Sequence, residues 1–467
     1  MTIRFGTDGW RAIIADGFTF DAVRAVARAL AAYLWRESDG GRPTVVIGYD
    51  RRFASDEFAR AASEELVARG LDVLLSRSAI TTPNLSYTTL ESKSQAGLMI
   101  TASHNPATYN GIKLKGKRGG AASTAMLRAV EAELSSDQHP EHEREFGQMT
   151  EIDPIPAYLD RLGREVDVSR IRSAGLTIVV DSMFGSTAGL MARIVGNDAT
   201  QIVELNALHN PLFPGISGPE PVERNLARLK KVVGDGGANI GIAFDGDGDR
   251  IGVVNEHGEY VSSQHVFALL TRYILHHRGR HGPIVKSVTG STMINVLGET
   301  SSVPVIETAT GFTNISQTMI ERSASIGGEE SGGFAFGFHL PDRDGLLAAL
   351  LLVDYTLQSG MSVSDLINDL ESAIGKWRFR RVDLPLSRES RAAVEERLGT
   401  LEWPGEVASL RVKDVVQTDG TRVEFVDGSW LLIRNSGTEP LLRVYAESHD
   451  AETVDALLLG ARTLVGV

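Results

Sequence analysis

The stretch AGLMITASHNPATYNGIK, residues 96–113, joins a short apolar run to a loop rich in reactive side chains. The run Ala96–Ile100 has the length and composition of a buried β-strand. Ser103 comes directly after it, in the loop at the strand's exit, where α/β sheets place their ligands. His104 and Lys113 bring a proton donor and a cation to the same segment. The stretch predicts an α/β fold with a nucleophilic serine at a sheet edge, although a serine that only caps a turn fits the same pattern.

A second segment, AFDGDGDRIGVVNE (243–256), is typical of a site for a hard cation. Asp245, Asp247 and Asp249 alternate with glycines, so three carboxylates can turn toward one centre. Carboxylates so close repel each other unless a cation lies between them. Three oxygen ligands that leave open positions suit Mg²⁺ better than a fully enclosed Ca²⁺. We therefore predict a magnesium site, with phosphoryl chemistry as its use.

An EF-hand calcium loop is the alternative for this segment, because Glu256 stands where such a loop has its last ligand. Two features argue against it. Arg250 takes the place of the glycine that the loop needs for its turn, and Ile251–Val254 has the composition of a strand where further ligands should lie. Both favour the magnesium site.

A third segment, RNSGTEP (434–440), follows the apolar run Trp430–Ile433. It combines a guanidinium and two hydroxyls with a glycine that lets backbone N–H groups face an anion, which is typical of a phosphate cradle. The same residues also occur in ordinary turns, and the chain contains no Walker A motif. The residues that would hold a phosphate are Arg434, Ser436, Gly437 and Thr438.

Composition limits the partners and the cellular setting. The chain has 467 residues, with 47 basic and 60 acidic side chains, and its net charge of −13 argues against nucleic acids and anionic membranes as partners. It has no cysteine, which excludes disulfides and thiol catalysis. The N-terminus lacks the apolar core of a signal peptide, and the longest apolar run, Leu346–Val353, is too short to span a membrane. We expect a cytoplasmic enzyme.

Helical and strand patterns alternate along the chain, which favours mixed sheets with crossover helices. Phe20–Trp35 and Ser123–Leu134 show helical spacing, and Thr44–Gly48 has a strand composition. The polar stretch Ser135–Asp153 is expected to be a surface connection. The length predicts three or four domains, each with its own core.

Five motifs in this order resemble those of the α-D-phosphohexomutase family: FGTDGWR (5–11), TASHNP (101–106), DGDGDR (245–250), GEESGG (328–333) and RNSGTEP (434–440). They extend over nearly the whole chain, so the resemblance is far more specific than any one motif. It implies four domains around a central cleft, the first three with a shared α/β mixed-sheet topology and the fourth a smaller α+β domain. The expected ranges are 1–152 with the phosphoserine loop, 153–255 with the metal loop, 256–375 with the sugar loop and 376–467 with the phosphate loop.

The resemblance also implies an activity. A phosphate on Ser103 would pass to a hexose phosphate and give a hexose 1,6-bisphosphate, which reorients in the site and returns its other phosphate to the serine. The result is interconversion of hexose 1-phosphate and hexose 6-phosphate, with Mg²⁺ as cofactor and glucose 1,6-bisphosphate as intermediate and activator. The expected metal ligands are Ser103, Asp245, Asp247 and Asp249.

The resemblance assigns a role to each further motif residue. Arg11, His104 and Arg250 would orient or neutralise the transferring phosphate. Lys113 would be the general base, with a pKa lowered by nearby cations, or alternatively would only bind phosphate. Substrate contacts are expected from the remaining positions, which are Glu329, Ser331, His339, Arg434, Ser436, Gly437 and Thr438.

The motifs look closer to the phosphoglucomutase/phosphomannomutase branch than to the phosphoglucosamine branch, which usually has glutamine after the loop glutamate. Gly333 and Thr313 depart from members that carry histidine and lysine there, so the preferred sugar is left open between glucose, mannose and glucosamine. A phosphosugar-binding regulator without turnover is a further alternative, and an oligomeric state of monomer or dimer is open. The intact Ser103 and the three aspartates favour an enzyme.

Overall fold

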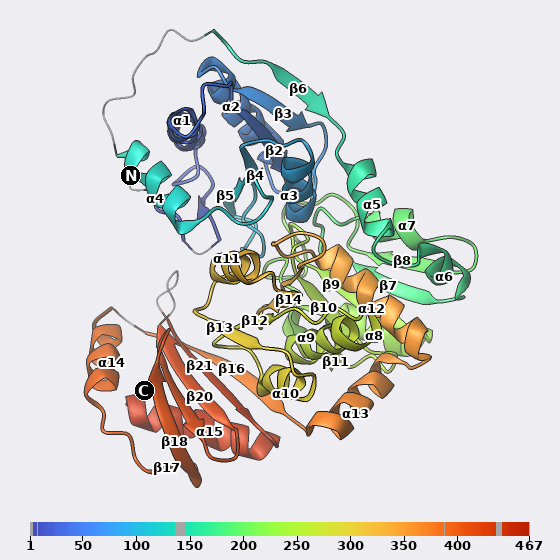
Figure 1. The fold of residues 1–467 in the computed structure, drawn as a ribbon, viewed down its shortest axis with the longest axis vertical. Helices are drawn as coiled ribbons and strands as arrows, with labels where there is room; N and C mark the ends of the chain where they lie inside the picture. Colours follow the sequence, from blue (N-terminus) through green and yellow to red (C-terminus); the bar gives the residue numbers. More distant parts are fainter. Residues whose placement is uncertain (1–2, 7, 136–144, 387, 436–440, 467) are drawn as a thin grey trace.

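In the part of the chain that the structure describes, four β-sheets follow one another (Figure 1). The structure is a computed structural model that describes residues 3–6, 8–135, 145–386, 388–435 and 441–466. The first three sheets mix parallel and antiparallel strands and carry helices, whereas the fourth is antiparallel throughout. The predicted fold class is confirmed.

The first sheet has the strand order β1-β5-β4-β2-β3-β6. Its parallel strands are β2, β3, β4 and β6, and β5 and β1 extend it in antiparallel pairing. The strands are β1 (Trp10–Ile13), β2 (Thr44–Tyr49), β3 (Asp72–Ser76), β4 (Ala96–Ile100), β5 (Tyr109–Gly116) and β6 (Met149–Ile152). The helices of this part are α1 (Phe20–Arg36), α2 (Ser55–Ala68), α3 (Thr82–Glu91) and α4 (Thr124–Leu134).

The second sheet has the order β11-β10-β9-β7-β8. Its strands are β7 (Thr177–Asp181), β8 (Gln201–Leu205), β9 (Ile240–Phe244), β10 (Ile251–Val254) and β11 (Tyr260–Val261). The helices are α5 (Ile155–Gly163), α6 (Val168–Ser173), α7 (Leu190–Val195), η1 (Glu223–Asn225) and α8 (Ala227–Gly236). Because β11 pairs with β10, this sheet extends past the expected boundary at residue 255.

The third sheet has the order β13-β12-β14-β15. Its strands are β12 (Ile284–Ser287), β13 (Val305–Thr308), β14 (Ile326–Gly328) and β15 (Phe334–Phe336). The helices are α9 (Ser263–Arg272), which continues into the short π-helix η2 (Tyr273–His277), α10 (Thr292–Thr300), α11 (Phe312–Arg322), α12 (Gly345–Ser359) and α13 (Val363–Ile374).

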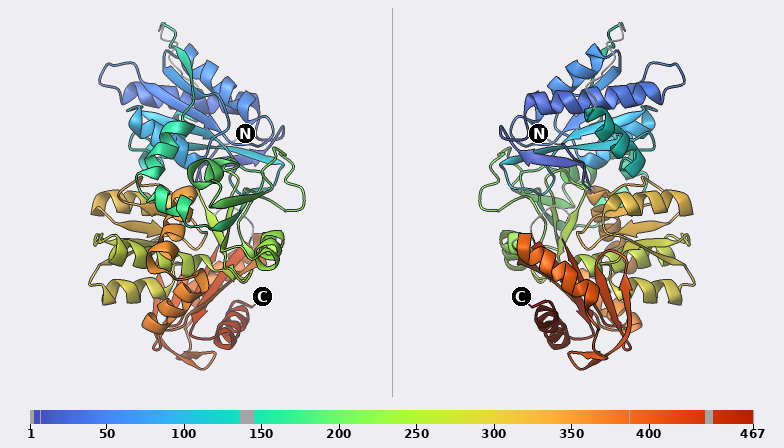
Figure 2. Two further views of the ribbon diagram at one scale, coloured as in Figure 1. Left: turned by 90° about the vertical axis from the view of Figure 1, so that its right-hand side faces the viewer. Right: turned by 90° about the vertical axis from the view of Figure 1, so that its left-hand side faces the viewer.

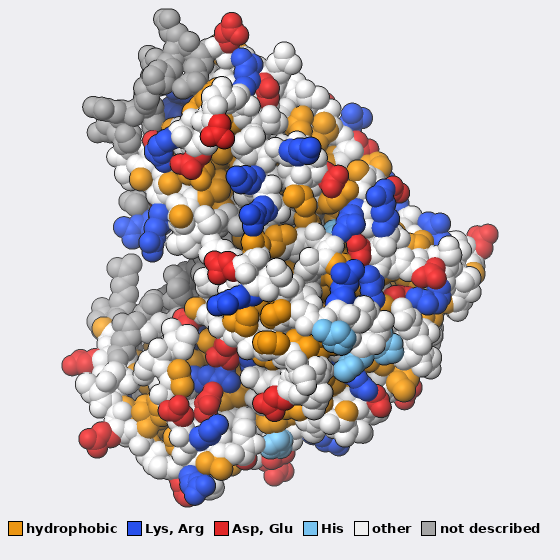
Figure 3. All heavy atoms as spheres, in the orientation of Figure 1, with side chains coloured by type: hydrophobic (Ala, Val, Ile, Leu, Met, Phe, Trp, Pro, Cys, Tyr) orange, Lys and Arg blue, Asp and Glu red, His pale blue; other side chains and the backbone are white. Residues whose placement is uncertain are grey.

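The fourth sheet has the order β16-β21-β20-β19-β18-β17. Its elements are β16 (Arg378–Pro385), α14 (Arg388–Thr400), β17 (Glu406–Val407), β18 (Leu410–Gln417), β19 (Thr421–Phe425), β20 (Trp430–Asn435), β21 (Leu441–Ser448) and α15 (Ala451–Val465). This part and the first sheet lie at opposite ends of the long axis, with the second and third sheets between them (Figure 2). The surface is hollowed between the first and fourth parts (Figure 3).

One local device recurs in the first three sheets. A buried parallel strand is followed by an antiparallel partner, in the pairs β4–β5, β9–β10 and β14–β15. The hairpin loops hold residues 101–108, 245–250 and 329–333, which are the serine, aspartate and glutamate motifs. The shared topology therefore places three motifs in equivalent loops.

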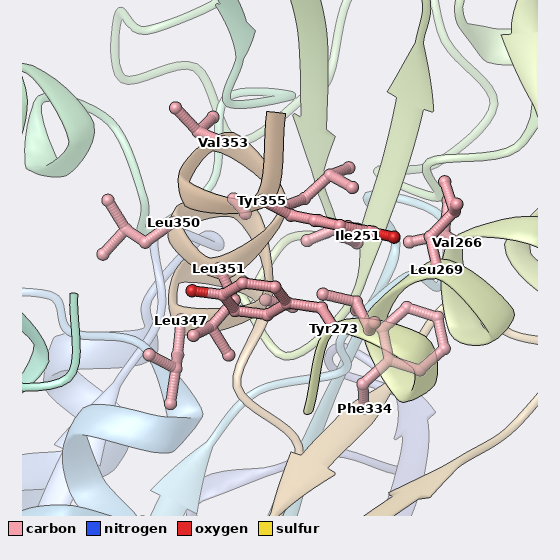
Figure 4. Packing of buried hydrophobic residues seen from close by; sticks show 14 of the residues in the cluster. Ile251, Val266, Leu269, Tyr273, Phe334, Leu347, Leu350, Leu351, Val353 and Tyr355 are labelled. Carbon is pink, nitrogen blue, oxygen red and sulfur yellow. The ribbon is translucent and has the colours of Figure 1, made fainter. Parts of the chain in front are cut away.

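The second and third sheets share one large hydrophobic cluster, although each also has a smaller cluster of its own. Helix α12 is the reason, because its residues from Gly345 to Tyr355 are all buried. Figure 4 shows its Leu347 and Leu351 among Tyr273, Ile251 and Phe334, which come from the third and second parts. A helix that is apolar on every side must be covered on every side.

The polar stretch after α4 is the other correction. Residues 136–144 lie outside the described part, but Met149–Ile152 forms the edge strand β6 against β3. Its alternation is too short and too polar to mark it as a strand, and the backbone pairing with Val73–Ser76 decides its conformation.

In the described residues no single helix has the length and apolar character needed to cross a membrane. The pair α12 and α13 meets those criteria only when taken together, and the two helices are bent by 79° to each other.

Candidate active site

The loop after β4 holds Ser103 in a fixed, strained position. Its φ of 51° lies in the left-handed region, and the residue is fully buried. The Ser103 amide donates to Thr101 Oγ1 at 2.9 Å, and its carbonyl accepts from Arg52 Nη2 at 2.6 Å. Thr101 in turn donates to Asp50 at 2.6 Å. The loop is thus tied to the sheet on both sides of the serine, which fixes the direction of its hydroxyl.

The hydroxyl points at the metal loop of the second sheet. Ser103 Oγ donates to Asp245 Oδ2 at 2.7 Å, although the two residues are far apart in the chain. Asp245, Asp247 and Asp249 are fully buried, and one oxygen of each lies within 4.8 Å of those of the others. The structure therefore brings the predicted nucleophile and the predicted metal ligands together.

The glycines of this loop are required by close packing. A Cβ on Gly246 would lie 2.6 Å from the Ser103 carbonyl oxygen, and one on Gly248 would lie 2.7 Å from Thr187 and Thr81. Gly248 also has a φ of 72°, which residues other than glycine rarely adopt. The alternation of glycine and aspartate is therefore a steric requirement as well as a chemical one.

Some carboxylate oxygens of the three aspartates are bound by other side chains, and others have no hydrogen-bond partner among the described residues. Lys113 Nζ lies 2.8 Å from Asp247 Oδ2 and 2.7 Å from Asp249 Oδ2. Within the described part of the chain, Oδ1 of Asp247 and Oδ1 of Asp249 are buried and have no hydrogen-bond partner. Unpartnered buried carboxylate oxygens are costly, and a bound cation would satisfy them. The residues fit a hard divalent cation.

The charge of the group leads to the same conclusion. Burial, Asp249 and Asp247 raise the pKa of Asp245 well above its ordinary value. A cation between the three carboxylates would remove this repulsion. The EF-hand alternative is wrong, because Glu256 hydrogen-bonds to Ser364 and β10 begins at Ile251.

The predicted cations surround the same centre. Arg11 Nη1 donates to Asn105 Oδ1 at 2.7 Å, and Arg250 Nε lies 3.8 Å from Asp249 Oδ1. His104 Nδ1 lies 3.4 Å from Ser103 Oγ. Burial and the charges of Arg250, Arg11 and Lys113 lower the pKa of His104 well below its ordinary value, so its ring is neutral at pH 7.

Lys113 corrects one expectation. Burial alone would lower its pKa, but Asp247, Asp249 and Asp8 raise the pKa of Lys113 above its ordinary value. Its Nζ lies 3.0 Å from Asp8 Oδ2 in addition to the two contacts given above. The pKa of Lys113 is therefore not lowered in this arrangement, and the amine is charged.

The loop after β14 brings Glu329 and Ser331 to the third side of the site. Glu329 Oε1 accepts from the Gly311 amide at 2.8 Å, and its side chain is 9% exposed. Burial and Glu330 raise the pKa of Glu329 to about 7. Among the residues that the structure places, the buried Ser331 Oγ has no hydrogen-bond partner. Both groups are polar and have bonding capacity left for a ligand.

His339 lies in a buried, polar environment. Its side chain is 1% exposed, and Nε2 lies 2.9 Å from Asp344 Oδ2. Asp344 also caps α12 and accepts from Tyr158. The contacts of His339 are with the protein interior, and its contact with the sugar stays a prediction.

Of the phosphate-loop motif, only Arg434 and Asn435 lie in the described residues. Ser436, Gly437 and Thr438 are outside them. Arg434 lies near the end of β20, and its Nη2 lies 3.3 Å from Asp419 Oδ2. Asp419 also accepts from the Thr310 amide at 2.9 Å, so Arg434 is tied to the segment that leads into α11.

Four family models match successive parts of the chain. They describe domains I, II and III and the C-terminal domain of phosphoglucomutase/phosphomannomutase, and they match residues 2–141, 156–258, 262–373 and 388–459. The chain belongs to the phosphoglucomutase/phosphomannomutase family.

Individual members of this family are similar over their whole length. A phosphoglucomutase/phosphomannomutase of Thermococcus kodakarensis is 30% identical, covering 98% of both chains. A "probable phosphoglucosamine mutase" of Methanothermobacter thermautotrophicus is 32% identical, covering 96% of this chain and 94% of its own. A solved structure of a "putative phosphomannomutase" from Thermus thermophilus is 32% identical, covers 100% of both chains and has a TM-score of 0.87.

Two charged residues of the phosphohexomutase site were missed by sequence reasoning. Asp8 and Arg343 contact each other at 2.8 Å, and both contact the group around Lys113. Asp8 lies inside the motif FGTDGWR, and Arg343 lies four residues after the predicted site residue His339, in HLPDRDG (339–345). Their presence there was the available signal, but the contact between them joins the first and third domains, and Arg343 also contacts Asp249 of the second.

Proposed function

We propose that this phosphohexomutase interconverts the 1-phosphate and 6-phosphate of glucose, and less efficiently of mannose, through a phosphorylated Ser103 and a hexose 1,6-bisphosphate. The observation that carries the proposal is the 2.7 Å hydrogen bond from Ser103 Oγ to Asp245 inside a buried group of three aspartates. A hydroxyl held beside a site for a hard cation is what phosphoryl transfer to and from a serine requires.

Asp245, Asp247 and Asp249 would hold Mg²⁺ together with the Ser103 phosphate. When bound, the ion would withdraw charge from the phosphoryl group and make it a better acceptor for the sugar hydroxyl. In the transfer, the bond from phosphorus to the serine oxygen breaks as the bond to the sugar oxygen forms. The proton of the sugar hydroxyl ends on the serine oxygen, so no net proton is released.

The cations around the three aspartates would stabilise the negative charge of the phosphoryl group during this step. Because Lys113 is charged, we assign it to binding the phosphate and neutralising the aspartates. Phosphate binding was the alternative to its role as general base. Arg11 comes from the first domain and Arg250 from the second, and both can neutralise the transferring group. The neutral His104 can hydrogen-bond the phosphate through its ring.

Sugar recognition is assigned to Glu329 and Ser331. A carboxylate and a hydroxyl can bind two neighbouring ring hydroxyls, and such a pair can bridge O3 and O4 in either ring orientation. That tolerance suits an intermediate that must turn over. Arg434, with Ser436, Gly437 and Thr438, would hold the phosphate that is not reacting.

The runner-up substrate is glucosamine phosphate, favoured by the Methanothermobacter thermautotrophicus relative and its name. Solved structures with the same fold support the substrate class, since that of Aspergillus fumigatus N-acetylphosphoglucosamine mutase contains GlcNAc-6P and magnesium, at 13% identity and a TM-score of 0.60. A regulator without turnover would not need a hydroxyl hydrogen-bonded to one member of a buried group of three carboxylates.

The decisive experiment compares three sugars. We would measure kcat/KM with glucose 1-phosphate, mannose 1-phosphate and glucosamine 1-phosphate, each with Mg²⁺ and its own bisphosphate. We expect kcat/KM to be higher with glucose 1-phosphate than with mannose 1-phosphate. The difference in transition-state free energy should stay within about 1–3 kcal/mol, because Glu329 and Ser331 would bind hydroxyls common to both sugars. A preference for glucosamine would establish the runner-up, and no turnover of any of the three would refute the proposal.

A further inference from the structure

Arg343 is a buried arginine at the centre of the site that none of the roles above uses. Its side chain is 2% exposed and extends from the segment between β15 and α12. A buried guanidinium is stable only where carboxylates compensate it. Its partners therefore show what it does.

These partners come from three domains. Arg343 Nη2 lies 2.7 Å from Asp249 Oδ2 and 2.8 Å from Asp8 Oδ2. Nη1 lies 3.9 Å from Glu329 Oε2, and the guanidinium carbon lies 5.0 Å from the centre of the Phe312 ring. One rigid, planar group thus faces a metal-loop aspartate, a first-domain aspartate and the sugar-loop glutamate.

The backbone and the aliphatic part of Arg343 are held in place as well as its guanidinium. The Arg343 amide donates to Asp342 Oδ1 at 3.0 Å, and Asp342 is itself held by Ser86 at 2.8 Å and by Lys115. A Cβ on Gly333 would lie 2.2 Å from Arg343 Cδ. The absence of a side chain at 333 is therefore what gives the arginine its path into the site.

The contacts determine which oxygens stay open. Asp249 Oδ2 is bound by both Arg343 and Lys113, whereas the buried Oδ1 has no hydrogen-bond partner among the described residues and lies 3.8 Å from Arg250 Nε. Glu329 Oε1 is bound by the Gly311 amide, and Oε2 is turned toward Arg343. Arg343 thus hydrogen-bonds one carboxylate on the metal side and lies within ion-pair distance of one on the sugar side.

We propose that Arg343 is a positioning residue that couples the metal loop to the sugar-reading loop, and that Gly333 is the space that admits it. The proposal rests on the function proposed above for Asp249 and Glu329. The physical reason is that the two arms of a planar guanidinium can face two carboxylates at once, which the compact ammonium of a lysine cannot do.

The first test uses Arg343→Met and Arg343→Lys in the full chain, with Arg164→Met as the matched control on a side chain that is 71% exposed. Mg²⁺-induced stabilisation is followed by thermal unfolding, and KM for the hexose phosphate by activity. Arg343→Met should raise both the Mg²⁺ midpoint and KM by about tenfold or more. Arg343→Lys should recover the Mg²⁺ midpoint but leave KM high, because an ammonium supplies charge at Asp249 without the second arm toward Glu329.

The pH profile separates positioning from mere packing. Glu329 faces Glu330, Arg343, Arg250 and the Gly311 amide, and the two arginines and the amide favour its ionised form. In Arg343→Met the acid limb of kcat/KM should therefore move to higher pH, and in Arg164→Met it should not. An unmoved limb would argue that Arg343 does not act on Glu329.

The second test examines the space at Gly333. Gly333→Ala should impair Mg²⁺ stabilisation and KM in the wild-type background, because the methyl group displaces the arginine. In the Arg343→Met background, whose flexible side chain can move aside, the same change should add little. Additive effects of the two substitutions, or a wild-type Mg²⁺ midpoint and KM in Arg343→Met, would overturn the proposal. If the wild type turns over none of the three sugars, the proposed function fails separately, and the Mg²⁺ midpoints still test the link to the metal loop.

Discussion

At the scale of single residues, the site stores strain where the chemistry is expected. Ser103 has a left-handed backbone, which costs a residue with a Cβ about 1–2 kcal/mol. The contacts of Thr101 and Arg52 hold it there. The strain turns the hydroxyl toward Asp245, a direction that an ordinary turn would not provide.

Ser103→Ala and Ser103→Gly should both abolish turnover, because the covalent acceptor is lost. The glycine variant should unfold at the higher temperature of the two, by the equivalent of about 1 kcal/mol, since glycine has no penalty at this φ. Activity assays, thermal unfolding and peptide mass spectrometry of the active wild type, which should show phosphate on Ser103, check this. A fully active alanine variant would exclude the mechanism.

Glu329→Gln should change the pH dependence of stability in a defined direction. The folded pKa of about 7 lies above the ordinary value of 4.5, so the folded state takes up the proton first. The stability that this proton provides is present at low pH and is lost as pH rises through 7. As pH rises from 4.5 to 7, Glu329→Gln should therefore gain stability relative to wild type, by up to about 3 kcal/mol. Urea unfolding at a series of pH values measures it, and equal pH dependence in both proteins would contradict the assignment.

At the scale of elements, one hairpin design serves three purposes. Each buried strand delivers a loop to the site, and an antiparallel partner returns the chain at once. Short loops between buried strands have few conformations, which positions their side chains well. In the metal loop this close packing restricts the sequence, because the neighbours of Gly246 and Gly248 leave no room for a Cβ.

Gly248→Ala should be much more harmful than Gly237→Ala. Both glycines have positive φ, 72° and 64°, so the backbone penalty is similar. A Cβ at 248 would meet Thr187 and Thr81 at 2.7 Å, whereas at 237 nothing lies within 4 Å. We expect about 1–3 kcal/mol of additional loss at 248 from overpacking, with weaker Mg²⁺ stabilisation. Thermal unfolding with and without Mg²⁺ compares them, and equal losses would show that backbone strain alone is responsible.

At the scale of the whole molecule, the fourth domain is attached to the third by buried polar contacts. Glu447 Oε2 accepts from the Thr292 amide at 2.7 Å, at the start of α10, and from Trp430 Nε1 at 2.8 Å. Arg422 lies over the Trp430 ring and donates to the Val288 carbonyl. Polar contacts of this kind fix an orientation, because each depends on direction as well as distance.

Glu447→Ala should destabilise the protein by about 2–4 kcal/mol, because the buried Trp430 donor and the partly buried Thr292 amide lose their acceptor. The charge-matched control is Glu424→Ala on β19, where the side chain is 38% exposed and only a small effect is expected. Denaturant unfolding measures both. If the two variants lose the same stability, Glu447 does not anchor the interface.

Arg434→Ala should weaken hexose phosphate binding from the fourth domain. Loss of a guanidinium–phosphate contact of about 1.5–3 kcal/mol predicts a roughly ten- to hundredfold rise in KM. The bisphosphate should also escape before its second transfer, so added glucose 1,6-bisphosphate should restore much of the rate. Steady-state kinetics with and without the bisphosphate test this, and an unchanged KM would remove Arg434 from the cradle.

The sequence by itself determined the family, the fold class and the loops that form the site. Ser103 and the three aspartates could be predicted because each motif is contiguous, and local chemistry explains why its residues stand side by side. Strands such as Ala96–Ile100 and helices such as Phe20–Arg36 could be predicted because their apolar spacing is local too. Assignments to the sugar and phosphate loops remain predictions.

Only the tertiary structure decided the electrostatics and the sharing of the core. The charge of Lys113 and the link from Arg343 to Asp8 and Asp249 depend on distances between residues that lie in different domains, which no local pattern contains. The pairing with β3 decides the conformation of the polar strand β6, and the burial of α12 decides that the second and third domains share a large hydrophobic cluster. In each case the energy lies in an interaction between elements, so it exists only once the chain has folded.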